Sequence, residues 1–138
     1  MRLLATADWH LGKTMRGRSR LSEHEAVLVQ MVDIAASECV DAVLISGDVF
    51  DRSIPDGESN RLFLDTCCRF RGMGMSVVVI SGNHDSAQSF DAWQRIADLA
   101  GIHIIGSVPA DPNALVLNLD GGTVVALPWV PERYVLSW

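Results

Sequence analysis

The sequence lacks the features that would place the protein in a membrane or outside the cell. No apolar run approaches the ~20 residues that a helix needs to cross a bilayer. The opening residues, MRLLATADWH, carry a single Arg and then an Asp inside what would have to be the apolar stretch, so they are not a secretion signal. We therefore expect a cytoplasmic protein with no membrane partner.

Cysteine is scarce. The three cysteines are odd in number and include an adjacent pair, Cys67 and Cys68, with Cys39 apart from them. This spacing fits neither a disulfide framework nor a CxxC zinc site. We expect reduced thiols that are mostly buried, with the adjacent pair in the core of a helix.

Positive charge is not in excess, because the net charge is −6. A nucleic-acid partner would therefore need a local basic surface or bound metal cations. Four of the eleven basic residues fall within eight positions: Lys13, Arg16, Arg18 and Arg20. Such a cluster is usually a solvated loop. Its place directly after the first motif described below favours contacts with phosphate groups.

What is present is the composition of one globular domain, with 138 residues, 49% hydrophobic and 20% charged. Short runs rich in β-branched residues, at 3–7, 41–46 and 76–80, end at polar or glycine residues and are typical of strands buried on both faces. Helical patterns separate them and also precede a fourth run at 102–105. This alternation predicts an α/β fold, with a largely parallel sheet flanked by helices.

The expected helices have recognisable ends. Ser22 as N-cap, with Glu25 three residues later, forms a capping box. A second helix opens at 55–57 and ends near Arg71, and a third begins near Ser86 and ends before Gly101. The expected apolar face of the first helix is Val27, Leu28, Met31, Ile34 and Ala35, and that of the third is Phe90, Trp93, Ile96, Ala97 and Ala100.

Beyond residue 105 the pattern changes. Segments 114–119 and 123–127 are separated by Asp120, Gly121 and Gly122, which is a hairpin signal and predicts antiparallel strands at the edge of the sheet. The chain ends at WVPERYVLSW without a stop signal, tail or linker. We expect residues 1–138 to be the amino-terminal part of a domain whose remainder is missing.

Polar residues gather where the first three expected strands end. They are Asp8 and His10 in DWH, Asp48 and Asp51 in GDVFDR, and Asn83, His84 and Asp85 in GNHD. The carboxyl ends of neighbouring parallel strands lie together, so these residues can meet at one site. Carboxylate, imidazole and amide ligands suit Mn²⁺, Fe²⁺ or Zn²⁺. Two such ions sharing a carboxylate could clamp a phosphodiester and activate water.

The motifs DxH, GDxxDR and GNHD, in this order, resemble the first three motifs of the calcineurin-like metallophosphoesterases. The resemblance implies two divalent metal ions. Asp8 and His10 would bind the first, Asp48 would bridge the two, and Asn83 would bind the second.

The same resemblance implies roles close to the substrate. His84 would stand beside the scissile phosphate and donate a proton to the leaving oxygen. Asp51 would orient that histidine and raise its proton affinity. Arg52 would lie close to the substrate phosphate.

Longer strings sharpen the resemblance. ADWHLGK and SGDVFDRSIP are similar to the SbcD-type nuclease subunits and their archaeal and eukaryotic counterparts in double-strand-break repair, and the likeness covers nearly the whole chain. It implies a Mn²⁺-dependent DNA exonuclease and endonuclease that works with an SbcC-type ATPase on DNA breaks or hairpins.

The later motifs of that family, a GH pair and a GHxH pair of histidines, are absent from these residues, which hold four histidines in all. This stretch alone is therefore expected to bind metal weakly and could be inactive. Two alternatives stay open: a phosphoesterase for small substrates, and a non-catalytic module that binds DNA ends or assembles the complex. Manganese-dependent cutting of a 3′-ended duplex by a full-length version would separate them.

Three further residues are assigned structural roles. His24, in the first turn of the capped helix, is expected to be solvated or locally bonded. His103, in GIHIIG, is expected to be a strand residue. Trp9 is expected to pack under its loop in preference to stacking on a base.

The second and third helices carry more apolar residues than one stripe needs: Leu62, Phe63, Leu64, Cys67, Cys68 and Phe70, with Phe90 and Trp93 nearby. The family resemblance implies a homodimer that meets through these helices, with Leu62, Phe63, Phe90 and Trp93 at the interface. The alternative is that the surplus packs against the rest of a longer domain.

Overall fold

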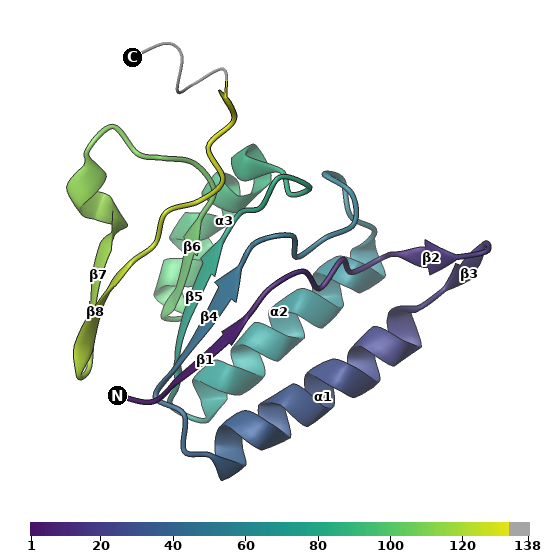
Figure 1. Ribbon diagram of the computed structural model, residues 1–138, viewed down its shortest axis with the longest axis horizontal. Coiled ribbons are helices and arrows are strands. Elements are labelled where there is room, and N and C mark those ends of the chain that lie inside the picture. The colour runs from purple at the N-terminus through teal and green to yellow at the C-terminus, as the bar shows by residue number, and fades with distance from the viewer. Residues whose placement is uncertain (133–138) are drawn as a thin grey trace.

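The computed structural model describes residues 1–132, and its centre is a four-stranded parallel sheet in the order β1-β4-β5-β6 (Figure 1). The strands are β1 (Leu3–Thr6), β4 (Ala42–Ser46), β5 (Ser76–Ile80) and β6 (Ile102–Ile105), and the crossover helices are α1 (Leu21–Ser37), α2 (Gly57–Gly72) and α3 (Ala87–Leu99). The predicted α/β fold is confirmed. Within residues 1–132, no helix is long and apolar enough to cross a membrane.

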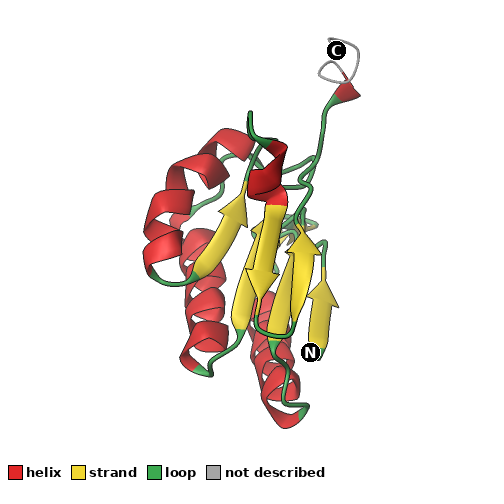
Figure 2. Ribbon diagram, turned by 90° about the vertical axis from the view of Figure 1, so that its left-hand side faces the viewer, coloured by secondary structure: helices red, strands yellow, loops and turns green. Residues whose placement is uncertain are grey.

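The two faces of the sheet are covered differently (Figures 1 and 2). All three helices pack on one face, as same-handed crossovers between successive parallel strands require. The other face carries a short 3₁₀ turn, η1 (Pro112–Leu115), and the antiparallel pair β7 (Val116–Leu119) and β8 (Gly122–Val125). The antiparallel strands predicted near the C-terminus are therefore present, and they form a sheet of their own.

Side chains of the central strands alternate between these two faces. In β5, Val77 and Val79 contact the helices, whereas Val78 and Ile80 pack with the β7–β8 pair. β4 and β5 are largely buried on both faces, as predicted. β1 is not, because it is the edge strand with a single neighbour, and Leu3 is 44% exposed.

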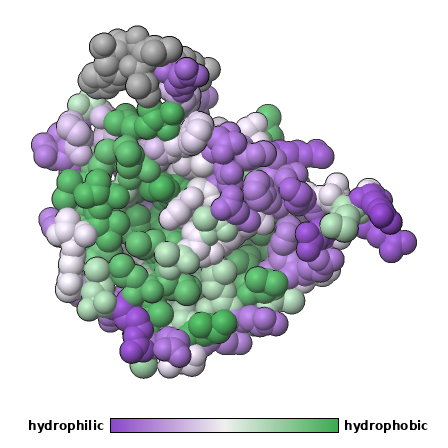
Figure 3. Space-filling model, in the orientation of Figure 1, coloured by the Kyte–Doolittle hydropathy of each residue, from purple (hydrophilic) through white to green (hydrophobic). Residues whose placement is uncertain are grey.

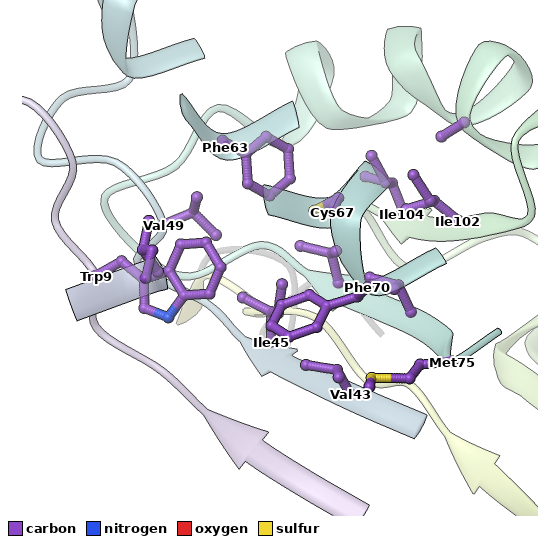
Figure 4. Close-up of a cluster of buried hydrophobic side chains, with 14 of the residues drawn as sticks. Trp9, Val43, Ile45, Val49, Phe63, Cys67, Phe70, Met75, Ile102 and Ile104 are labelled. Carbon is purple, nitrogen blue, oxygen red and sulfur yellow. The ribbon is translucent and has the colours of Figure 1, made fainter. Parts of the chain in front are cut away.

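An aromatic cluster of Phe50, Phe63, Phe90 and Trp93 fills the helix side of the core. The rings of Phe63 and Phe90 stack with centroids 6.3 Å apart, and Trp93 stacks on both. Phe50 meets Phe63 edge-on at 5.5 Å. Figure 4 shows Phe63 in line with the other buried residues of α2 that lie above the sheet. The aromatic cluster thus joins α2, α3 and the loop after β4 into one core.

This packing corrects the predicted dimer contacts. Phe63 and Phe90 are 0% and 1% exposed, so their side chains are not available to a partner in this fold. The apolar surplus of α2 and α3 is used within the chain, because the two helices pack on each other's aromatic residues. Leu62 and Trp93 are partly buried against the same core.

The start of α1 also differs from the prediction. The helix begins before Ser22, and Arg20 is its N-cap residue. The carbonyl of Arg20 accepts hydrogen bonds from the N–H groups of Glu23 and His24, both at 3.0 Å. Ser22 is therefore already helical, and the predicted capping box with Glu25 does not form.

The buried face of α1 is rotated from the predicted one. Leu28 and Ala35 are buried as expected, together with Val32, which the sequence pattern missed. Val27 and Ile34 are each 55% exposed. The three buried residues follow i, i+4, i+7 spacing, which is the narrow stripe that a helix at the sheet edge presents to its neighbours. The third helix is similar, since Ile96 is 73% exposed.

The cysteine prediction holds for one residue of three. Cys67 is fully buried beneath α2, and burial strongly raises the pKa of its thiol. Cys39 and Cys68 are exposed. Adjacent residues on a helix face different directions, so a buried Cys67 turns Cys68 towards solvent.

Candidate metal centre

The loops that follow β1 and β4 bring three predicted ligands together. Ligand atoms of Asp8, His10 and Asp48 all lie within 4.8 Å of one another. The Nε2 atom of His10 is 3.8 Å from an Asp8 carboxylate oxygen. Two carboxylates and an imidazole, with no thiolate nearby, form a donor set that fits Mn²⁺, Fe²⁺ or Zn²⁺.

Backbone hydrogen bonds hold these ligands in place. The N–H of Asp8 donates to the carbonyl of Gly47 at 3.1 Å, and the N–H of His10 donates to the carbonyl of Asp48 at 3.0 Å. Asp8, His10 and Asp48 have φ values of 58°, 46° and 50°. Residues with a side chain rarely adopt this left-handed conformation, and it persists where surrounding contacts determine it.

The strand pairing resumes beyond the ligands. After a break that contains Asp8, His10 and Asp48, a parallel bridge joins Leu11 to Phe50. Both of these residues are buried, at 2% and 1% exposed. The ligand residues of the first two loops are therefore bracketed by paired backbone on both sides.

The loop after β5 touches the loop after β4 through two glycines. A Cβ atom on Gly47 would lie 2.8 Å from the Cα of Gly82, and one on Gly82 would lie 2.1 Å from a carboxylate oxygen of Asp48. Neither position can carry a side chain at this approach. The contact lets the Asp48 carboxylate accept a hydrogen bond from the N–H of His84 at 3.0 Å.

Asn83 and His84 lie at this same edge of the sheet, and both are exposed. The His84 ring meets the His10 ring edge-on, with centroids 5.0 Å apart. His84 is thus beside the cluster of Asp8, His10 and Asp48 and open to a substrate, as its predicted role requires.

Asp51 lies elsewhere than the family resemblance implied. Its Oδ1 atom is 3.6 Å from Nδ1 of His10 and 3.6 Å from the ammonium of Lys13. Among the described residues it forms no ion pair with His84. The cause is its backbone N–H, which donates to the Leu11 carbonyl at 3.0 Å and draws Asp51 towards the loop that carries His10.

The predicted basic cluster forms a projecting hairpin, β2 (Thr14–Met15) paired with β3 (Arg18–Ser19) (Figure 1). Figure 3 shows hydrophilic side chains gathered at this end of the molecule. Arg20 is paired with Glu23 at 2.7 Å. Arg16 and Arg18 are exposed and form no ion pair within residues 1–132, and Arg52 is exposed beside Asp51.

Beside the ligands, a cleft of about 450 Å³ separates the loop after β1 from α1. His24 lines this cleft and is half-buried, with its Nδ1 buried and unpartnered among the described residues. Burial, and then the charge of Arg20, lower the pKa of His24, while Glu23 acts in the opposite sense. The expectation of a solvated or locally bonded histidine is therefore wrong.

Two other predictions are confirmed. Trp9 is 8% exposed, and its indole N–H donates to the Thr6 hydroxyl at 2.9 Å, so it packs under its loop. His103 is a residue of β6. No role was assigned from the sequence to Asp85, whose buried carboxylate accepts backbone hydrogen bonds from both metal-site loops. Its only signal was its place at the end of GNHD.

Comparison with known proteins agrees with this geometry. The family model described as calcineurin-like phosphoesterase matches residues 1–130. The chain is 39% identical over 120 residues to the D subunit of the SbcCD nuclease from Rhodobacter capsulatus, covering 86% of this chain and 30% of that protein. It is 42% identical over 113 residues to the Bacillus subtilis protein of the same name, covering 81% and 29%.

The protein of that name from Escherichia coli K12 is 30% identical over 139 residues, covering 99% of this chain and 35% of its own length. The chain therefore spans about a third of the length of these curated relatives. Because the family model covers nearly every described residue, the conclusion about the family does not depend on the remaining two thirds. The chain belongs to the calcineurin-like phosphoesterase family.

Proposed function

We propose that this chain is the metal-binding amino-terminal part of a nuclease that cleaves DNA phosphodiester bonds with two divalent ions, Mn²⁺ being the expected metal. The observation that carries the proposal is the convergence of Asp8, His10 and Asp48 within 4.8 Å at the carboxyl ends of β1 and β4. The names of the relatives, which are nuclease subunits, support DNA as the substrate.

In this proposal Asp8 and His10 hold one ion, Asp48 holds both, and Asn83 holds the second. Bound divalent ions would polarise a phosphoryl oxygen and lower the pKa of a water molecule. His84 donates a proton to the leaving oxygen, and its exposure beside the ligands supports that role.

Asp51 has a different proposed role from that implied by the family. Its carboxylate faces Nδ1 of His10, while Nε2 of the same ring faces Asp8. A carboxylate behind a ligand histidine fixes the orientation of the ring and raises its basicity. We therefore assign Asp51 to orienting His10, with Lys13 balancing its charge.

The projecting β2–β3 hairpin favours a polymeric substrate over a small one. Arg16 and Arg18 are exposed on the hairpin and free of ion pairs within residues 1–132, so their charges are available to phosphates. Arg52 and Lys13 lie nearer the metal centre. A chain with a net charge of −6 needs such a local basic surface to hold DNA.

The assembly is also a proposal. The relatives are named for the SbcCD nuclease, which supports a partner of the SbcC ATPase type and work on double-strand breaks or hairpins. For a homodimer, the exposed apolar residues of α2 and α3 are the available surface: Leu64, Ile96 and Leu99, at 42%, 73% and 90% exposed. Ile96→Glu should then halve the sedimentation mass of the full-length protein, and an unchanged mass would rule this surface out.

The test of the nuclease proposal is cleavage of a linear 3′-ended duplex by the full-length protein with and without Mn²⁺. Arg16→Glu with Arg18→Glu should weaken DNA cleavage and leave hydrolysis of bis(p-nitrophenyl) phosphate unchanged. Equal loss on both substrates would favour a small-substrate phosphoesterase. DNA binding without Mn²⁺-dependent cleavage of either substrate would favour a non-catalytic module.

A further inference from the structure

We propose that Asp85 is a positioning residue that locks the Asp48 loop to the loop carrying Asn83 and His84, and so sets the geometry of the metal centre. Its carboxylate is 9% exposed and accepts three backbone hydrogen bonds. The donors are Val49 at 3.2 Å, Phe50 at 2.9 Å and Gly82 at 2.8 Å.

These bonds tie together two different loops. Val49 and Phe50 directly follow Asp48, whereas Gly82 directly precedes Asn83. One carboxylate therefore fixes the backbone on both sides of the contact between the loops. A charged acceptor makes stronger hydrogen bonds than a neutral one, and three buried N–H groups would otherwise lack this partner.

The link runs in both directions. Asp85 reaches across to the Asp48 loop, and the Asp48 carboxylate reaches back to the N–H of His84 at 3.0 Å. The oxygen of Asp48 that accepts this bond is thereby fixed in space before any ion arrives. Displacing the Asp85 link would free the Asp48 loop to move, and the bridging carboxylate would move with it.

Asp85 therefore touches no reacting atom and acts through Asp48, Asn83 and His84. Groups that orient metal ligands typically contribute about 10-fold to 100-fold to metal affinity. Asp85→Asn keeps the size of the side chain but replaces one acceptor oxygen with a donor that opposes a backbone N–H. We expect the dissociation constant for Mn²⁺ to rise in this variant by about the same 10-fold to 100-fold.

Asp91 supplies a matched control. Its carboxylate also accepts backbone hydrogen bonds, from Gly106 and Ser107, both at 3.1 Å, and it lies between α3 and the end of β6. Asp91→Asn removes a comparable structural link outside the two loops. If Asp85 has a merely structural role, both variants should lose stability and neither should lose Mn²⁺ affinity selectively.

The experiment titrates Mn²⁺ into the full chain, wild type and both variants, by calorimetry or electron paramagnetic resonance. Weaker binding in Asp85→Asn alone supports the proposal, and binding equal to wild type or equally weak in both variants overturns it. The proposal rests on the metal site proposed above, and absence of Mn²⁺ binding by the wild type would count against that site instead.

Hydrogen exchange of the unaltered, metal-free chain keeps the positioning role testable in either case. The amides of Val49, Phe50 and Gly82 should exchange much more slowly than that of Ser53, which lies in the same stretch of chain. Exchange of all four at similar unprotected rates would overturn the proposal.

Discussion

The metal-site loops and the aromatic cluster adjoin each other and are built on opposite principles. Within a single loop after β4, Asp48 and Asp51 face the site, while Val49 and Phe50 are 0% and 1% exposed in the core. The site side chains are held by the backbone and have few packing partners. The aromatic residues are held by packing alone. Function and stability should therefore be separable by substitutions a residue or two apart.

The largest test of this separation is Asp48→Asn. Removing the charge of a carboxylate proposed to serve both ions should abolish Mn²⁺ binding and DNA cleavage by the full-length protein. The amide oxygen can still accept the hydrogen bond from His84, so the urea midpoint should barely change. Asp65→Asn, an exposed carboxylate of α2, is the control and should leave both properties intact.

His84→Gln divides the site itself. We expect cleavage to slow by about 10²-fold to 10⁴-fold, the usual contribution of a general acid, while calorimetric Mn²⁺ affinity stays unchanged. The exposed ring makes little contact with the core, so stability should also stay unchanged. A weaker Mn²⁺ titration in this variant would show that His84 supports the metal, contrary to its proposed role.

Phe63→Ala tests the other side of the comparison. Its ring packs with four aromatic neighbours, and removal should lower the free energy of unfolding by about 3–5 kcal/mol. Leu64→Ala, one residue along and 42% exposed, should cost only about 0.5 kcal/mol. Urea denaturation measures both. Loss of Mn²⁺ affinity in folded Phe63→Ala would mean that the core and the site are not separable.

The smallest expected effect concerns His24, which borders both regions. Its folded pKa is below the ordinary value of 6.5, so the unfolded chain takes up the proton first as the pH falls. The contribution of neutral His24 is complete above pH 6.5 and is lost as the pH drops through the lower folded pKa. The groups around it are Arg20, Glu23, Asp51 and His10.

His24→Gln should accordingly flatten the acid side of the stability profile, measured in chelator to exclude metal. The control is His103→Gln, on a different strand. If the slope between pH 6.5 and pH 5 is the same in His24→Gln and in wild type, the assigned burial effect is wrong.

The contrast between the two regions also explains what sequence could predict. Strand and helix order followed from β-branched runs and from glycines, because those signals are local. The ligands Asp8, His10 and Asp48 were found because parallel strands share an edge. Which face of α1 is buried was missed, since Val27 and Val32 are chemically alike and only tertiary packing distinguishes them.

The remaining misses have the same origin. Phe63 and Phe90 were assigned to a partner because sequence shows an apolar surplus without showing how α2 and α3 meet. The position of Asp51 depends on one backbone bond to Leu11, for which no sequence signal exists. Asp85 was overlooked because its partners are N–H groups, which nearly every residue has.

The bridge between Leu11 and Phe50 has a consequence for how quickly an ion can be taken up. The two ligand loops are pinned at both ends, so they lose little conformational entropy when an ion binds. Capture then requires no coupled folding step, and its rate should follow the shedding of water by the ion. Manganese and magnesium, which shed water at different rates, should therefore associate at correspondingly different speeds in stopped-flow mixing.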